Sequence, residues 1–240
     1  MFSSISDLFA TEHLLAFLTL TSLEIVLGID NIVFIAIITD KVEKRLQSAA
    51  RKIGLALAMI ERIFLLSFLS WAVALTEPLF QFLSLSLSGR DLILIGGGVF
   101  LIGKATIELH SLTSPSKRDE NKDSHKKKLG LASALIQITI LDTVFSLDSV
   151  ITAVGMVDSL VIMIMAVVTA VVIMMLFANP ISEFILKHPT VKVLSLAFLL
   201  LIGVFLLADG IGNHINKGYI YFAMGFSLLV EFLNLRAQKT

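Results

Sequence analysis

Acidic side chains interrupt two of the longest apolar segments of this chain, and this feature constrains its fold more than any other. The segment at residues 14–38 is long enough to cross a bilayer, yet it contains Glu24 and Asp30. The same order of residue types returns in a later apolar segment, where Asp142 and Asp148 occupy the places of these two acids. A carboxylate at the centre of a membrane costs about 2.5–3.5 kcal/mol even on a lenient insertion scale. Four of them therefore require a structural or functional reason.

The composition indicates an integral membrane protein. Of the 240 residues, 56% are hydrophobic and 16% are charged, and the mean hydropathy is +0.91, whereas soluble domains are about a quarter charged. The 19 basic and 19 acidic side chains balance, so no overall field favours a nucleic-acid partner. The absence of cysteine excludes disulfides, thiolate metal sites and cysteine nucleophiles. The first residues lack the basic start of a secretory signal, so we expect the first helix to remain in the mature protein.

Seven apolar stretches are each long enough to form a membrane-spanning helix. They lie at about residues 14–39, 53–75, 91–109, 131–157, 160–178, 191–208 and 218–235. Lys and Arg concentrate in the first, third and fifth connections, which places these connections in the cytoplasm under the positive-inside rule. We therefore predict an all-α membrane protein with an external N-terminus and a cytoplasmic C-terminus.

The order of these helices divides the chain into two halves. Each half has a helix interrupted by acids, a plain helix and a glycine-containing helix, and residues 98–101 resemble residues 203–206. Because each half crosses the membrane an odd number of times, the halves must insert with opposite orientations, as in transporters built from inverted repeats. The predicted organisation is a first repeat at 1–110, a charged cytoplasmic linker at 111–129, a second repeat at 130–210, and an additional helix and tail at 211–240.

Polar residues around the acids form a matching stripe in each half when they are placed at helical spacing. The stripes contain Thr21, Glu24, Gly28 and Asn31 in the first half, and Thr139, Asp142, Ser146 and Ser149 in the second, with Gln137 one turn further along. Asp30 lies about 120° around an ideal helix from Glu24, so both acids can face one site only if the helix is distorted. Gly28 predicts such a distortion in the first helix.

Carboxylates from both halves, with nearby amide and hydroxyl groups, would form a site of hard oxygen ligands. Such a site suits Mn²⁺, Mg²⁺ or Ca²⁺ better than soft metals. Four ionised acids exceed the charge of one divalent ion, so repulsion and desolvation favour the retention of protons when the metal leaves. The alternative is a structural role, in which the acids pair with Arg62 and Lys104, the basic residues deep in the second and third helices. Either cation could also act as a counter-charge that occupies the acidic site after the metal has left.

The two acidic segments resemble the signature segments of a known family. Residues 23–31 and 142–150 are similar to those of the TerC family of membrane proteins, and the resemblance extends over essentially the whole chain. Residues 104–109, 188–190 and 217–219, together with Arg62, resemble its short branch without appended domains. The resemblance implies a seven-span bacterial inner-membrane protein of a family associated with manganese export and named for tellurium resistance. It implies as metal ligands Glu24, Asp30, Asp142 and Asp148, supported by Asn31 and Ser149.

The leading interpretation is a secondary transporter that exports a divalent metal, with Mn²⁺ as the first candidate, in exchange for protons. The metal is then a substrate, no cofactor is permanently bound, and the partners are the ion, protons and the lipid bilayer, with homo-oligomerisation left open. The alternative function is a non-transporting factor in membrane-protein assembly or stress response, since chloroplast members of the TerC family are linked to assembly. An intramembrane aspartyl protease needs one acidic pair and not four, so we predict no enzymatic activity.

Overall fold

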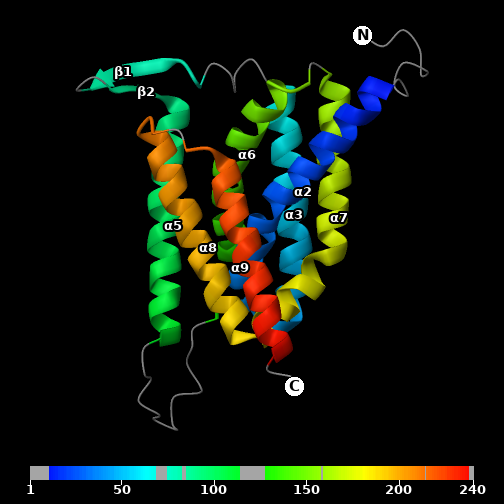
Figure 1. The fold of residues 1–240 in the computed structure, drawn as a ribbon, viewed down its shortest axis with the longest axis vertical. Coiled ribbons are helices and arrows are strands. Elements are labelled where there is room, and N and C mark those ends of the chain that lie inside the picture. The colour runs from blue at the N-terminus through cyan, green and yellow to red at the C-terminus, as the bar shows by residue number, and fades with distance from the viewer. Residues whose placement is uncertain are drawn as a thin grey trace. The chain divides into compact units, whose positions relative to one another are not determined.

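A computed structural model describes residues 11–68, 75–82, 85–113, 128–157, 159–213 and 215–237. Within these ranges the chain forms seven long helices, which confirms the prediction of an all-α membrane protein (Figure 1). They are α2 (Thr11–Asp40), α3 (Lys44–Ser67), α5 (Gly89–Thr113), α6 (Leu131–Val154), α7 (Leu160–Lys187), α8 (Pro189–Gly210) and α9 (Lys217–Ala237). Most of the predicted linker, residues 114–127, lies outside the described residues.

A short hairpin between α3 and α5 was not predicted. Strand β1 (Pro78–Phe82) pairs antiparallel with β2 (Leu85–Ser88), and the register shifts between Pro78 and Phe80. The rest of the described chain follows the predicted helical pattern, although the helix boundaries differ by several residues.

Six of the seven helices are long and apolar enough to cross a membrane, and α3 is the one described helix that does not meet these criteria. This helix begins at Lys44, earlier than the predicted start at residue 53, and it contains Arg51, Glu61 and Arg62. Polar contacts inside the fold account for Arg51 and Arg62, as described below.

Two compact units make up the chain. The first unit contains Met1–Glu77 and Lys128–Ser182, and the second contains Pro78–Lys127 and Glu183–Thr240. The first unit therefore groups the first two helices of each predicted repeat, whereas the second groups the third helix of each repeat with α9. This is a grouping by packing and not by internal symmetry, so the repeat boundaries and the orientation of the termini stay predictions.

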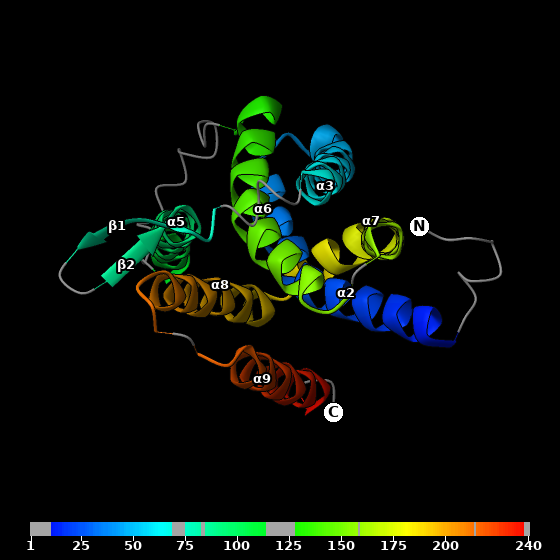
Figure 2. The same cartoon turned by 90° about the horizontal axis from the view of Figure 1, so that it is seen from above.

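In the first unit, α6 packs against both α2 and α3 (Figure 2). Glycines allow close contacts with neighbouring side chains: a Cβ atom at Gly54 would lie 3.2 Å from Ile138, and one at Gly28 would lie 2.1 Å from the sulfur of Met174. Helix α2 continues without interruption from Thr11 to Asp40. The structure therefore shows no break of α2 at Gly28, and this glycine makes room for Met174 of α7.

In the second unit, α5 and α8 lie side by side and touch through their backbones (Figures 1 and 2). A Cβ atom at Gly98 would lie 2.7 Å from the carbonyl oxygen of Gly203, and one at Gly203 would lie 3.0 Å from the carbonyl oxygen of Gly98. At Gly210 a Cβ would lie 2.8 Å from the carbonyl oxygen of Asp91. Small residues on membrane helices permit this kind of close approach.

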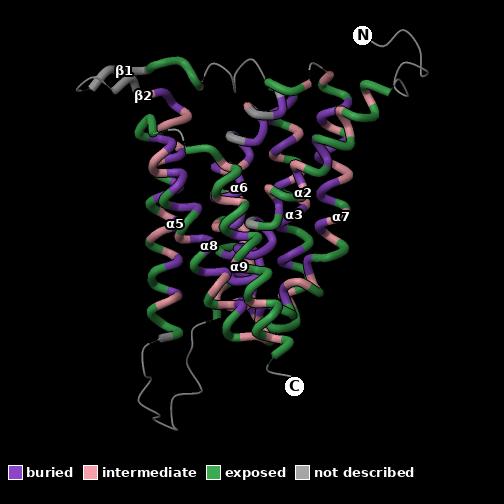
Figure 3. The backbone as a smooth tube through the Cα atoms, viewed as in Figure 1, coloured by how far each residue is buried: buried purple, intermediate pink, exposed green. Residues whose placement is uncertain are grey.

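Two further features complete the second unit. Helix α9 packs on α8 but is largely exposed (Figure 3). Met224 is its one buried residue. At the end of α8, Asp209 is buried and forms an ion pair with Arg90 of α5 at 2.7 Å. Gly212 then terminates α8 with a positive φ of 86°, and the amide of Asn213 donates to the carbonyl of Ala208, as in a Schellman cap.

Candidate functional site

The centre of the first unit contains a buried arginine that links two acids from different helices. Arg62 of α3 is 2% exposed, and its Nη1 forms an ion pair with Glu24 Oε2 of α2. Its Nη2 lies 3.4 Å from Asp142 Oδ1 of α6, and its Nε donates to Ser146 Oγ at 3.1 Å. Burial of charged groups is tolerable when they are paired and hydrogen-bonded. The two acids at equivalent positions of the predicted repeats thus share one guanidinium group.

Polar neighbours hold Asp142 in place through both of its carboxylate oxygens. The amide of Asn31 donates to Oδ1 at 2.8 Å, and the hydroxyl of Ser146 donates to Oδ2 at 2.9 Å. Ser149 is also buried, but its hydroxyl donates to the carbonyl of Ser146 at 3.2 Å. Of the predicted supporting residues, the structure therefore brings Asn31 and Ser146 into direct contact with an acid.

The other predicted supporting residues have different surroundings. Thr21 is buried, and its hydroxyl has no hydrogen-bond partner within the described part of the chain. Thr139 is half-buried, and its backbone carbonyl accepts a hydrogen bond from the hydroxyl of Thr143 at 2.9 Å. Gln137 donates its amide to the carbonyl of Ser133 at 3.1 Å, one turn back along α6.

Three predicted site residues need separate mention. The backbones of Asp30 and Asp148 lie in α2 and α6, but their side chains lie outside the described part of the structure. Lys104 is half-buried on α5, one turn before the buried Glu108, and so belongs to the second unit. Of the two candidate counter-charges, Arg62 is the one that the structure places against Glu24 and Asp142.

Glu61 is a neighbour of this site that sequence reasoning set aside. It precedes Arg62 on α3, and its carboxylate interacts with Thr143 of α6. The Oε2 atom of Glu61 is buried without a hydrogen-bond partner among the described residues. Its position beside an arginine in an otherwise apolar stretch was the sequence signal that could have identified it.

A second buried arginine organises one end of the first unit. Arg51 of α3 is 4% exposed, and its Nε donates to Thr39 Oγ1 of α2 at 3.2 Å. Its Nη1 donates to Asn179 Oδ1 of α7 at 3.0 Å, and Asn179 in turn donates to Ser48 Oγ at 2.9 Å. Sequence reasoning counted Arg51 as a cation of the first cytoplasmic connection. In the structure it lies inside α3, and its hydrogen bonds join α3 to α2 and α7.

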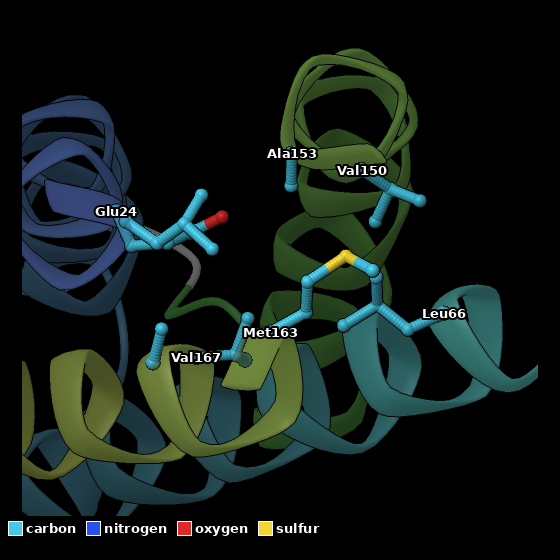
Figure 4. A pocket seen from close by; sticks show the side chains of 8 residues that line it. Glu24, Leu66, Val150, Ala153, Met163 and Val167 are labelled. Atoms are coloured by element: carbon cyan, nitrogen blue, oxygen red, sulfur yellow. The ribbon is translucent and has the colours of Figure 1, made fainter. Parts of the chain in front are cut away.

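Two small pockets flank the contacts of Arg62. One has a volume of about 10 Å³, room for about one water molecule, and Glu24 extends into it opposite Met163 and Val150 (Figure 4). The other also has a volume of about 10 Å³ and is lined by Asn31 and Asp142 with four apolar residues. The first pocket is lined by residues 20 and 24 of α2 and 150 and 153 of α6, and the second by residues 31–35 of α2 and 138–142 of α6. The pockets therefore lie on opposite sides of the charged centre. Among the described residues, no group of three or more acidic or histidine side chains is placed to hold a metal ion.

The sequence profile of the integral membrane protein TerC family matches residues 9–240. The chain belongs to the TerC family. It is 49% identical over 239 residues to a "UPF0053 protein" of Haemophilus influenzae, with 100% of this chain and 99% of the relative covered. It is 48% identical over 225 residues to the "UPF0053 inner membrane protein YgdQ" of Escherichia coli, with 94% of this chain and 93% of the relative covered.

A longer relative also matches this TerC protein. The "UPF0053 inner membrane protein YoaE" of Escherichia coli is 53% identical over 228 residues, which cover 92% of this chain but 42% of YoaE. No solved structure matches the chain. The names of the relatives and the six apolar helices identify a multi-pass protein of the bacterial inner membrane, as predicted.

Proposed function

We propose that this TerC protein exports divalent metal ions from the cytoplasm, with Mn²⁺ as the first candidate, in exchange for protons. One observation carries the proposal: Glu24 and Asp142 are buried in an apolar unit and brought together, although they lie on different helices. Two buried carboxylates have a high cost in a membrane unless they perform a task there. Binding a cation that must cross the membrane is such a task.

The proposed ligands are oxygen atoms, which favour hard divalent ions. Glu24 and Asp142 supply carboxylates next to the carboxamide of Asn31 and the hydroxyl of Ser146. Mn²⁺ and Mg²⁺ are well suited to carboxylate, carbonyl and water ligands. Asp30 and Asp148 complete the proposed ligand set through the resemblance of their segments to the family signatures.

The flanking pockets support transport over a purely structural role for the acids. A transporter must expose one site alternately to the two sides of the membrane. In the first unit, Glu24 borders one pocket, whereas Asp142 and Asn31 border the other. Small movements of the surrounding helices could therefore connect the same carboxylates to either side.

Metal flux through purified protein in lipid vesicles tests this proposal. We expect vesicles with the wild-type protein to move Mn²⁺ against its gradient when a proton gradient is imposed. Glu24→Gln and Asp142→Asn should each reduce this flux by at least about tenfold, since each removes one charged ligand. Asp30→Asn combined with Asp148→Asn should have the same effect.

Asp209→Asn provides a matched control, because Asp209 is also a buried acid paired with an arginine but belongs to the second unit. Its flux should remain close to that of the wild type. Equal losses in Asp209→Asn and Asp142→Asn would show that the acids support folding and not transport. If the Mn²⁺ flux does not change with the imposed proton gradient, the exchange of metal ions for protons is rejected. An absence of flux for every divalent ion would favour the non-transporting assembly or stress function.

A further inference from the structure

We propose that Arg62 is a built-in competitor of the transported cation: it occupies the carboxylate site of the metal-free protein and must withdraw before the cation binds. The inference rests on the proposed export of divalent metals. It assigns to Arg62 two effects: it sets the affinity of the site for the metal, and it allows the metal-free transporter to return to the conformation that accepts the next ion. Three observations support it, and each concerns the first unit alone.

First, Arg62 uses the atoms that a cation would need. Its guanidinium pairs with Glu24 Oε2 and approaches Asp142 Oδ1 within 3.4 Å, and its Nε binds Ser146 Oγ. A metal ion bound by both carboxylates would face a positive charge in a site of low dielectric, where like charges repel strongly. Metal and guanidinium therefore exclude each other from the site.

Second, the arginine has no counterpart in the other predicted repeat. The helix equivalent to α3 is α7, and its portion in the first unit, from Leu160 to Ser182, contains no charged side chain. One cation thus serves two acids from different repeats. If the acids were paired only for structural reasons, each repeat could supply its own cation. A mobile counter-charge that competes for one shared site has to be a single residue.

Third, the two acids that the arginine pairs with line the two pockets, and the arginine has another acceptor nearby. A cation that enters the pocket of Glu24, or the pocket of Asn31 and Asp142, meets carboxylates already paired with the guanidinium. Glu61 interacts electrostatically with Arg62 and has a buried oxygen without a hydrogen-bond partner among the described residues. This oxygen can receive the guanidinium when the metal displaces it.

Binding of Mn²⁺ to the purified full-length protein measures the competition directly. The resonance of aqueous Mn²⁺ in electron paramagnetic spectra disappears when the ion binds, so titrations give a dissociation constant. We expect Arg62→Gln to lower this constant about tenfold or more, since it removes the competing charge. Arg62→Lys keeps a positive charge but lacks the planar guanidinium group, so its dissociation constant should lie between those of the wild type and Arg62→Gln.

Arg51→Gln is the matched control, because Arg51 is a buried arginine of the same helix that binds Thr39 and Asn179, away from the acids. Its Mn²⁺ affinity should equal that of the wild type. An unchanged or weakened affinity in both Arg62 variants, or an equal gain in Arg51→Gln, would overturn the inference.

Flux measurements test the return step and separate this inference from the proposed function. If Arg62 neutralises the empty site, Arg62→Gln should slow net Mn²⁺ export at least about tenfold while exchange of internal for external Mn²⁺ continues. Loss of both fluxes at once, or of neither, would contradict the role of Arg62 and leave metal export intact as the wild-type function. An absence of Mn²⁺ binding and flux in the wild type and all variants would reject both proposals.

Discussion

The two compact units of this TerC protein differ in the contacts that join their central helices. The first unit contains large buried polar side chains, with Arg51 and Arg62 on one helix and their partners on three others. The second unit also has one buried ion pair, Arg90 with Asp209, but it brings α5 and α8 into backbone contact at Gly98 and Gly203. Polar side chains can form hydrogen bonds and ion pairs with new partners when helices move, whereas a close contact between two backbones is lost when the helices move apart. We infer that the first unit is the part built to change and the second the part built to stay the same.

The two units nevertheless share a geometric feature. In each of them, positions that correspond in the predicted repeats lie next to each other: Glu24 and Asp142 across Arg62, and Gly98 against Gly203. Reciprocal contacts of this kind are expected where a pseudo-twofold axis relates two helices. The inverted repeat itself stays a prediction.

The largest effect on stability is expected from removing Arg62 alone. Arg62→Leu leaves Glu24 and Asp142 buried without their shared cation, and breaking a buried ion pair on one side costs about 3–5 kcal/mol. Unfolding of the purified protein by sodium dodecyl sulfate measures this loss. The triple variant with Glu24→Gln and Asp142→Asn should recover most of the lost free energy, since it buries no unpaired charge. A triple variant no more stable than Arg62→Leu would show that packing, and not charge, makes this residue necessary.

The second-largest effect on stability is expected in the second unit, from adding one methyl group at the crossing of α5 and α8. Gly98→Ala and Gly203→Ala place a Cβ within 2.7–3.0 Å of backbone and side-chain atoms of the facing helix, so each should lower the unfolding free energy by about 1–3 kcal/mol. Gly96→Ala and Gly103→Ala on the same helix α5 are matched controls, because apart from the helix's own nearby backbone no atom lies within 4 Å of an added Cβ there. These controls should be neutral or stabilising by up to about 1 kcal/mol, the helix preference of Ala over Gly. Equal effects at all four positions would remove the basis for calling the second unit rigid.

These two regions also show what the sequence could and could not predict. Apolar length predicted the helices, since about 20 apolar residues suffice to define a span. The repeated acids predicted that Glu24 and Asp142 belong to one site, because equivalent positions of a repeat meet near its axis. Arg62 and Lys104 were predicted, from their depth in apolar segments, either as structural ion-pair partners of the acids or as a counter-charge. The structure places Arg62 between Glu24 and Asp142, an arrangement that fits both alternatives.

Other features depend on tertiary contacts that no local pattern encodes. The burial of Arg51 requires Asn179, which lies far away in the chain on α7, so its sequence position alone suggested a loop cation. Glu61 stayed unassigned because its contact with Thr143 comes from the packing of α3 on α6. Gly28 suggested a helix break because glycine is flexible, whereas its actual use depends on a side chain from another helix.

The smallest effect, Gly28→Ala, gives the finest test of the difference between the units. The added Cβ would lie 2.1 Å from the sulfur of Met174, closer than any contact at the α5 and α8 crossing. Methionine has a flexible, unbranched side chain that can turn away, and Ala is favoured over Gly within a helix by about 1 kcal/mol. We therefore expect Gly28→Ala to change the unfolding free energy by less than about 0.5 kcal/mol, well below the loss in Gly98→Ala. A loss as large as that of Gly98→Ala, in the same denaturant titration, would mean that the contact of α2 with α7 is as rigid as that of α5 with α8. The capacity for change would then be confined to the side chains around Arg62.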